Sequence, residues 1–112
     1  MVYYAQYLSF FEEARTEFLE SKGFTMKKLA ERGIYFVVAK QSIDYESPAY
    51  YADILDVRSW VSDSTAVRLI FDAEVKNQNG RVVATGKTTL VCVDETLKPK
   101  ALAEDFRDKL TS

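Results

Sequence analysis

The residues that could perform acid–base chemistry in this chain are carboxylates, tyrosines and lysines, because the sequence contains no histidine. Serine–histidine and cysteine–histidine nucleophile systems are therefore excluded within one chain, and the usual catalytic zinc sites lose their commonest ligand. We expect neither a metal nor a cofactor. Glu12 and Glu13 are candidates for a general base, because they lie in an aromatic segment where apolar side chains would surround a carboxyl group. The alternative for both is a solvated carboxylate or an ion pair, for example with Arg15.

The segment that carries these carboxylates is predicted to be a helix from about Gln6 to Lys22. Its apolar residues recur at helical spacing. They are Tyr7, Phe10, Phe11, Ala14 and Phe18. Gly23 suits the left-handed position after the last turn. A second, short helix is predicted between a cap at Thr25 and a stop at Gly33.

From Ile34 onward the apolar pattern changes to a period of two, which predicts strands. In the first strand the expected apolar face consists of Tyr35, Val37, Ala39, Ile43 and Tyr45. In the next two strands the expected inward residues are Leu55, Val57 and Val61, then Val67, Leu69, Phe71, Ala73 and Val75. Asn79 and Gly80 predict a tight hairpin turn. Gly86, inside the fourth strand, predicts a bulge or a close backbone approach.

These elements together predict an α+β fold. We expect four antiparallel strands, joined by hairpin-length loops and packed around the long helix, with a short terminal helix within 98–110. A length of 112 residues fits one domain that spans 1–112.

Composition narrows the partners and the compartment. The net charge is −2, with acidic and basic residues interspersed, which argues against a nucleic-acid partner because phosphates need a basic face. No apolar run approaches the ~20 residues of a membrane span. The single Cys92 lies in an apolar run and has no partner for an intrachain disulfide. A buried strand cysteine in a reducing cytoplasm is therefore expected.

Three segments together resemble a known family. They are YYAQYLSFFEEARTEFL, SPAYYADILDVRSWV and NQNGRVVATGKTTLVCVD. They are similar to the hotdog-fold acyl-CoA thioesterases of the 4-hydroxybenzoyl-CoA thioesterase family, and the likeness covers nearly the whole chain. The resemblance implies an antiparallel sheet wrapped around one long central helix. It also implies two protomers that pair edge to edge into a double-hotdog dimer, a homodimer or a homotetramer, with the active site between protomers.

The family's catalytic residue is an aspartate in an Asp-x-x-Gly segment, just before the residues that match Met1 to Tyr7. Two expectations follow for this sequence. Either Met1 is an internal methionine of a longer chain whose first strand and aspartate precede it, or the protein has lost this segment and works differently or only binds. We favour the first, because a sheet without its first strand exposes a long edge. The in-frame codons upstream of Met1 would distinguish them.

The resemblance implies hydrolysis of a short-chain aliphatic or aromatic acyl-CoA to the free acid and CoA. The alternative is a non-catalytic hotdog module that binds acyl-CoA or acyl-carrier thioesters. A hotdog dehydratase is a weaker alternative, because such enzymes typically depend on a histidine.

The candidate catalytic residues are Tyr4 and Glu12. Backbone N–H groups near Tyr4 would point at the thioester carbonyl from the start of the helix, and Glu12 matches the family's helix glutamate. The candidate substrate-binding residues are Gln6, Tyr7, Phe11, Tyr50 and Lys87. For the tyrosines the alternative is plain packing or a turn, and for Lys87 it is an ordinary surface lysine.

Overall fold

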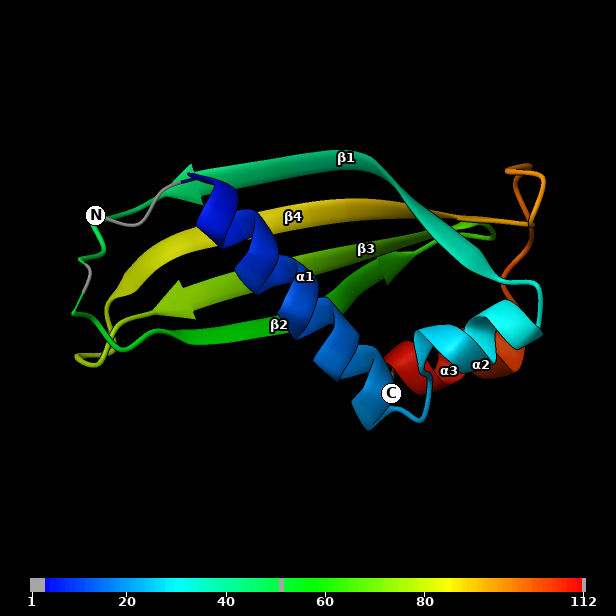
Figure 1. Cartoon of the computed structure of the whole chain (residues 1–112), viewed down its shortest axis with the longest axis horizontal. Helices are drawn as coiled ribbons and strands as arrows, with labels where there is room; N and C mark the ends of the chain where they lie inside the picture. Colours follow the sequence, from blue (N-terminus) through cyan, green and yellow to red (C-terminus); the bar gives the residue numbers. More distant parts are fainter. Residues whose placement is uncertain (1–3, 51, 112) are drawn as a thin grey trace.

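The computed structural model describes residues 4–50 and 52–111 of the chain, and for Tyr4, Ala5 and Thr111 it describes the backbone alone. A long helix, α1 (Tyr4–Ser21), lies across one face of a four-stranded sheet (Figure 1). A short helix, α2 (Met26–Glu31), follows it. The chain ends with α3 (Glu104–Thr111) beside α2. The α+β prediction is confirmed.

The sheet consists of β1 (Tyr35–Tyr45), β2 (Asp56–Ser64), β3 (Arg68–Lys76) and β4 (Val82–Val93). All neighbouring pairs are antiparallel, and the strand order is β1-β4-β3-β2. The expected hairpin between the first two strands is therefore wrong. The two lie at opposite edges, because β1 pairs with β4. The 46–55 connection, of which the structure describes 46–50 and 52–55, crosses the end of the sheet (Figure 1).

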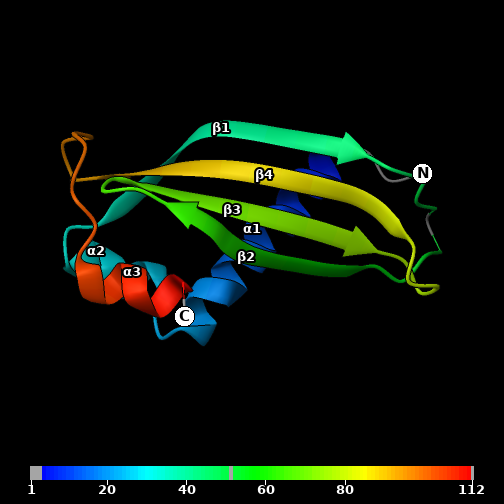
Figure 2. The same ribbon diagram turned by 180° about the vertical axis from the view of Figure 1, so that it is seen from behind.

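Helix α1 buries the face that the sequence pattern predicted. The side chains of Tyr7, Phe11 and Ala14 are buried, as is Leu19 one turn further on. The helix crosses the sheet diagonally and packs mainly against β2. The view from behind shows that none of the three described helices covers the opposite face of the sheet (Figure 2). Within the described ranges, no helix combines the length and apolarity that a membrane crossing requires.

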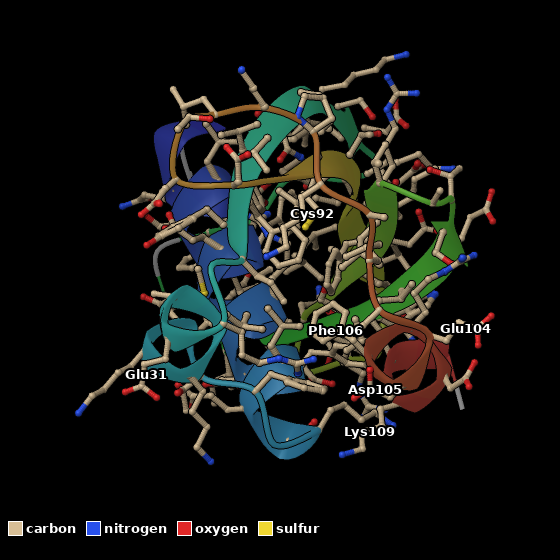
Figure 3. The ribbon with its side chains drawn as sticks, turned by 90° about the vertical axis from the view of Figure 1, so that its right-hand side faces the viewer. Glu31, Cys92, Glu104, Asp105, Phe106 and Lys109 are labelled. Atoms are coloured by element: carbon tan, nitrogen blue, oxygen red, sulfur yellow. The ribbon has the colours of Figure 1, made fainter. Side chains whose placement is uncertain are left out.

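Aromatic contacts hold the end of the sheet where the three helices meet. Phe106 is fully buried, and its ring lies 4.5 Å from that of Phe24 and 6.1 Å from that of Phe36. Figure 3 shows Phe106 directed from α3 into the molecule and Glu104 directed away from it. Cys92 is a buried free thiol in the same cluster, as predicted for a strand cysteine.

The prediction for Gly86 is confirmed in one of its two forms. A Cβ atom at this position would lie 2.6 Å from Cε2 of Phe11, so the glycine is required by a close approach of α1 to β4. The turn prediction is confirmed for Gly80, which has a φ of 77° in the loop between β3 and β4, and is wrong for Asn79, because Leu97 is the one described non-glycine residue with a positive φ.

The predicted apolar face of β1 is partly wrong. The pairing of β1 with β4 shifts between Val38 and Lys40, and a bulge of this kind moves the following side chains to the other face. Phe36 and Ile43 therefore pack against the core, although they differ in sequence parity. Tyr35 and Val37 instead remain substantially exposed, at 38% and 39%.

Candidate active site

The N-terminal end of α1 lies between the end of β1 and the 46–55 connection. The Tyr7 ring packs edge-on against Tyr45 of β1, with centroids 5.5 Å apart, and Ala49 of the connection is buried beside it. Helix α1 is described from Tyr4 onward, and the first backbone N–H groups of a helix have no partner within it and are aligned with its dipole. Such donors suit a developing oxyanion. The Tyr4 side chain lies outside the described residues.

The side chains of Tyr7 and Phe11 lie between this end of α1 and the sheet. Each side chain is only 1% exposed, in one core cluster. Burial raises the pKa of the Tyr7 hydroxyl, and the charges of Tyr45 and Asp53 add to the effect. These two aromatics therefore act as the floor of the region rather than as exposed contact residues.

Asp53 is a carboxylate near this region that sequence reasoning missed. Its Oδ2 accepts a hydrogen bond from the backbone N–H of Tyr50 (2.8 Å), and its Oδ1 accepts one from Nε2 of Gln78 (3.1 Å). These bonds lower the pKa of Asp53. Gln78 also accepts from the backbone N–H of Ile54 (3.1 Å). The carboxylate therefore ties the β1–β2 connection to the β3–β4 turn, and its lowered pKa makes it a weak general base.

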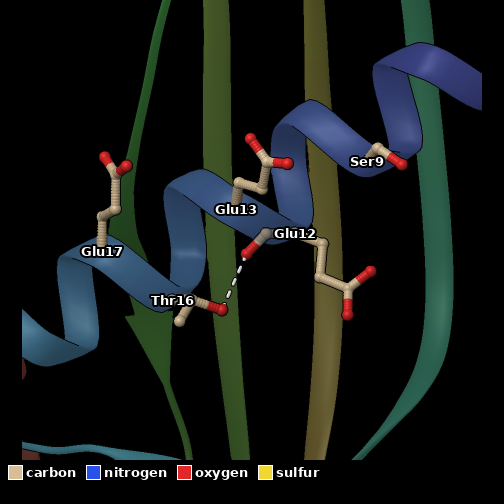
Figure 4. A pocket seen from close by; sticks show the side chains of 5 residues that line it. All are labelled: Ser9, Glu12, Glu13, Thr16 and Glu17. Carbon is tan, nitrogen blue, oxygen red and sulfur yellow. Dashed lines mark hydrogen bonds between the residues drawn. The ribbon is translucent and has the colours of Figure 1, made fainter.

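Glu12 lies further along α1, on the flank of the helix toward β1. Figure 4 shows it with Ser9, Glu13, Thr16 and Glu17. Glu12 is exposed, and its carboxylate projects over β4 on the β1 side of the helix. Among the ion pairs between described residues, none joins Glu12 to Arg15.

A groove of about 190 Å³ opens between α1 and β1, next to Glu12. Its walls are mostly apolar. The lining residues are Glu12, Arg15, Thr16, Leu19, Met26, Phe36, Val38 and Leu90. Val38 is 56% exposed and Met26 is 53% exposed, so this side of α1 is open where its other side is packed.

A polar line at this groove was also missed from the sequence. Thr88 of β4 is 3% exposed. Its Oγ1 accepts a hydrogen bond from Nη1 of Arg15 (3.2 Å) and donates one to Oε1 of Gln41 (2.6 Å). Burial lowers the pKa of Arg15, and the charge of Glu12 opposes that shift. The sequence signal that could have located this line is a polar residue, Thr88 or Gln41, at an inward position of an otherwise apolar strand.

The remaining predicted residues are spread over different surfaces. Gln6 is exposed on the first turns of α1, and Tyr50 is 61% exposed on the connection at the same end. Lys87 instead lies on the opposite face of the sheet, because Gly86 next to it faces α1. There its Nζ lies 3.7 Å from Oδ1 of Asp72. Across residues 4–50 and 52–111, no three or more Cys, Asp or Glu side chains are grouped to hold a metal ion.

The sequence matches the model of the Thioesterase-like superfamily over residues 1–110. The chain belongs to this family. The predicted hotdog fold is confirmed, because solved members of that fold superpose over nearly the whole chain. A DHNA-CoA thioesterase from Staphylococcus aureus is 26% identical, with a TM-score of 0.88 over 98% of this chain and 76% of that one.

Two curated relatives in the Thioesterase-like superfamily are similar along most of the chain. The acyl-CoA thioester hydrolase YbgC of Escherichia coli O6:H1 is 32% identical over 107 residues, 95% of this chain and 80% of YbgC. The long-chain acyl-CoA thioesterase FadM of Escherichia coli K12 is 34% identical over 108 residues, 95% of this chain and 81% of FadM.

Proposed function

We propose that this protein hydrolyses acyl-CoA thioesters to a free acid and CoA, with short-chain aliphatic or aromatic acyl groups as substrates. The similarity to YbgC and FadM over 95% of the chain supports the hydrolysis of acyl-CoA, since both are acyl-CoA thioesterases. FadM is a long-chain enzyme, so the short-chain or aromatic preference rests on the family resemblance of the sequence and not on FadM. The buried free thiol of Cys92 fits a cytoplasmic enzyme.

The chemistry requires donors for the oxyanion and a base that activates water. In our proposal the first backbone N–H groups of α1, near Tyr4, supply the donors. Glu12 is the candidate base within this chain, because it is an exposed carboxylate beside an apolar groove. Gln6 and Tyr50 would contact the substrate at the open end of α1, and Tyr7 and Phe11 would shape its floor. Lys87 lies on the face of the sheet opposite to these residues, so it would contact only a CoA phosphate that reaches that face.

We propose that two protomers pair through β1. This strand is an edge of the sheet, with unpaired backbone groups on its outer side. It also presents apolar side chains to solvent. Tyr35, Val37, Val38 and Tyr45 are 38%, 39%, 56% and 54% exposed. Sedimentation at micromolar concentration should show a dimer or a tetramer, and a stable monomer would contradict the pairing.

The test is thiol release from a panel of aliphatic and aromatic acyl-CoAs, followed with a chromogenic disulfide. Release of CoA thiol in proportion to enzyme is expected. Ligand-dependent thermal stabilisation without thiol release would instead identify a binding module.

The role of Glu12 is tested by Glu12→Gln, with Glu13→Gln as the matched control, because Glu13 is an exposed glutamate of the same helix that does not line the groove. If Glu12 is the base, kcat should fall by about 10²–10⁴-fold in the first variant and remain close to wild type in the second. Equal activity in both variants would remove Glu12 from the mechanism and leave the base to the family's aspartate.

A further inference from the structure

The groove between α1 and β1 contains one cation, Arg15, and the exposed carboxylate of Glu12 compensates for its burial only in part. Arg15 is half-buried, and among the described residues it forms no ion pair. A guanidinium has five N–H donors, and the hydrogen bond to Thr88 uses one of them. Placing a cation in an apolar wall is unfavourable unless a ligand or partner compensates for the lost hydration.

The fold fixes the direction of this guanidinium. The hydroxyl proton of Thr88 is committed to Oε1 of Gln41 (2.6 Å), so its oxygen is left to accept from Arg15. Gln41 is held in turn, because its Nε2 donates to the backbone oxygens of Lys87 (3.3 Å) and Ser42 (3.2 Å). All hydrogen bonds of this line therefore run in one direction, from Arg15 through Thr88 to Gln41 and on to the backbone. The other N–H donors of Arg15 can bind an acceptor that is not part of the line.

The apolar residues that line the groove indicate the chemistry of the remainder of the ligand. Leu19, Phe36 and Leu90 offer carbon surface on three sides of the groove. A volume of about 190 Å³ lies below the ~300–1,000 Å³ of pockets that hold drug-sized ligands, so only a short chain fits. Glu12 and Thr16 are the other polar residues of the lining. The Glu12 carboxylate is exposed, so water screens its repulsion of an anion.

We propose that this groove binds a short acyl chain that carries a carboxylate, with Arg15 as the residue that recognises the carboxylate. A guanidinium matches a carboxylate with two parallel hydrogen bonds, and the apolar walls strengthen the pair. The proposal rests on the thioesterase function above, which supplies two sources of this chemistry. One is the free acid that hydrolysis releases, and the other is an acyl-CoA with a distal carboxylate whose thioester lies beside Glu12, about one helical turn from Arg15.

Direct binding tests the groove without relying on turnover. Hexanoate and 1-hexanol share a chain length and differ in charge, so both are titrated into the full chain while the NMR signals of Arg15 Nε–H and the Thr88 amide are followed. Hexanoate should bind at least about tenfold more tightly than hexanol and should shift both signals. Equal binding of the two compounds, or shifts that avoid Arg15 and Thr88, would overturn the proposal.

Three variants sharpen the result. Arg15→Gln should weaken hexanoate binding by about tenfold or more, and Arg15→Lys should retain part of it because the charge stays without the planar fork. Glu12→Gln should strengthen binding, since a repelling charge is removed. Arg32→Gln is the matched control, because Arg32 is an exposed arginine that pairs with Asp105 outside the groove. Unchanged binding in Arg15→Gln would refute the assignment.

Hydrolysis then separates the two sources. Glutaryl-CoA and pentanoyl-CoA have the same chain length, and only the first has a distal carboxylate. A preference for glutaryl-CoA in kcat/KM that Arg15→Gln abolishes supports a substrate carboxylate. Equal hydrolysis of both, with competitive inhibition by pentanoate that Arg15→Gln relieves, supports the product. Hexanoate binding at Arg15 without hydrolysis of any acyl-CoA supports the groove and counts against the proposed function.

Discussion

The two sides of α1 differ in how they meet the sheet. Toward β2 and β3 the helix is sealed by aromatic and aliphatic contacts, such as the edge-on packing of Phe18 against Phe71 at 5.8 Å. Toward β1 it leaves a groove with an exposed Val38 and a half-buried Arg15. The comparison teaches that one helix performs two tasks. The side toward β2 and β3 stabilises the fold through apolar contacts. The side toward β1 carries polar groups whose burial costs stability.

Core truncation should separate the two sides most strongly. Phe71→Ala removes a ring that is 1% exposed, and it should lower the free energy of unfolding by about 3–5 kcal/mol. Val38→Ala on the open side should cost less than about 0.5 kcal/mol, because Val38 is 56% exposed. Urea unfolding of both variants measures the difference. Similar costs would mean that β1 is covered as well as β3.

The close approach of Phe11 to β4 gives the next largest effect. Gly86→Ala would place a Cβ atom 2.6 Å from the Phe11 ring, so we expect a loss of about 1–3 kcal/mol from overpacking. Phe11→Leu in the same chain should recover part of this loss, because it removes the clashing ring atoms. A double-mutant cycle by urea unfolding would show this coupling, and additive effects would argue against the contact.

The polar line on the open side should contribute less. Thr88→Val keeps the shape of the side chain but leaves Arg15 and Gln41 without their shared hydroxyl. We expect a loss of about 1–2 kcal/mol in the free energy of unfolding. Thr85→Val, on the opposite face of the same strand, is the control and should change little. A neutral Thr88→Val would show that the line is not needed for stability.

The smallest expected effect is on thermal stability at acidic pH. Hydrogen bonds from Tyr50 and Gln78 lower the pKa of Asp53. Since the folded-state pKa lies below the unfolded value of about 3.9, the contribution is present above that value and is lost as pH falls through the folded pKa. Asp53→Asn should therefore flatten the acid side of the melting-temperature profile between about pH 5 and pH 2. Parallel profiles for the two proteins would contradict this.

The sequence predicted the elements better than their partners. Helical spacing located Tyr7, Phe11 and Ala14 on one face, because a repeat of 3.6 residues depends only on local geometry. The pairing of β1 with β4 was not predictable in this way, since alternation identifies a strand and not its neighbour. The bulge near Ala39 then reversed the expected faces, because one additional residue changes the parity of a strand.

For the candidate site, sequence reasoning located single residues and missed the network. Gly86 predicted the close approach, and helical spacing placed Tyr7 on the buried face of α1. The line from Arg15 through Thr88 to Gln41 joins residues 73 and 47 positions apart. No local pattern reports such a distance, although a threonine facing inward on an apolar strand signals that a polar partner exists.

The position of β1 in the sheet has a consequence for folding. The β3–β4 hairpin closes through a short turn, so its contacts are local and form quickly. The contacts between β1 and β4 instead close much longer loops, from 39 positions for the pair Tyr45 and Ala84 to 58 positions for the pair Tyr35 and Val93. Such contacts carry a larger loop entropy and tend to form late. The wall that completes the Arg15 groove is therefore expected to be the last part of the sheet to assemble and the first to be released.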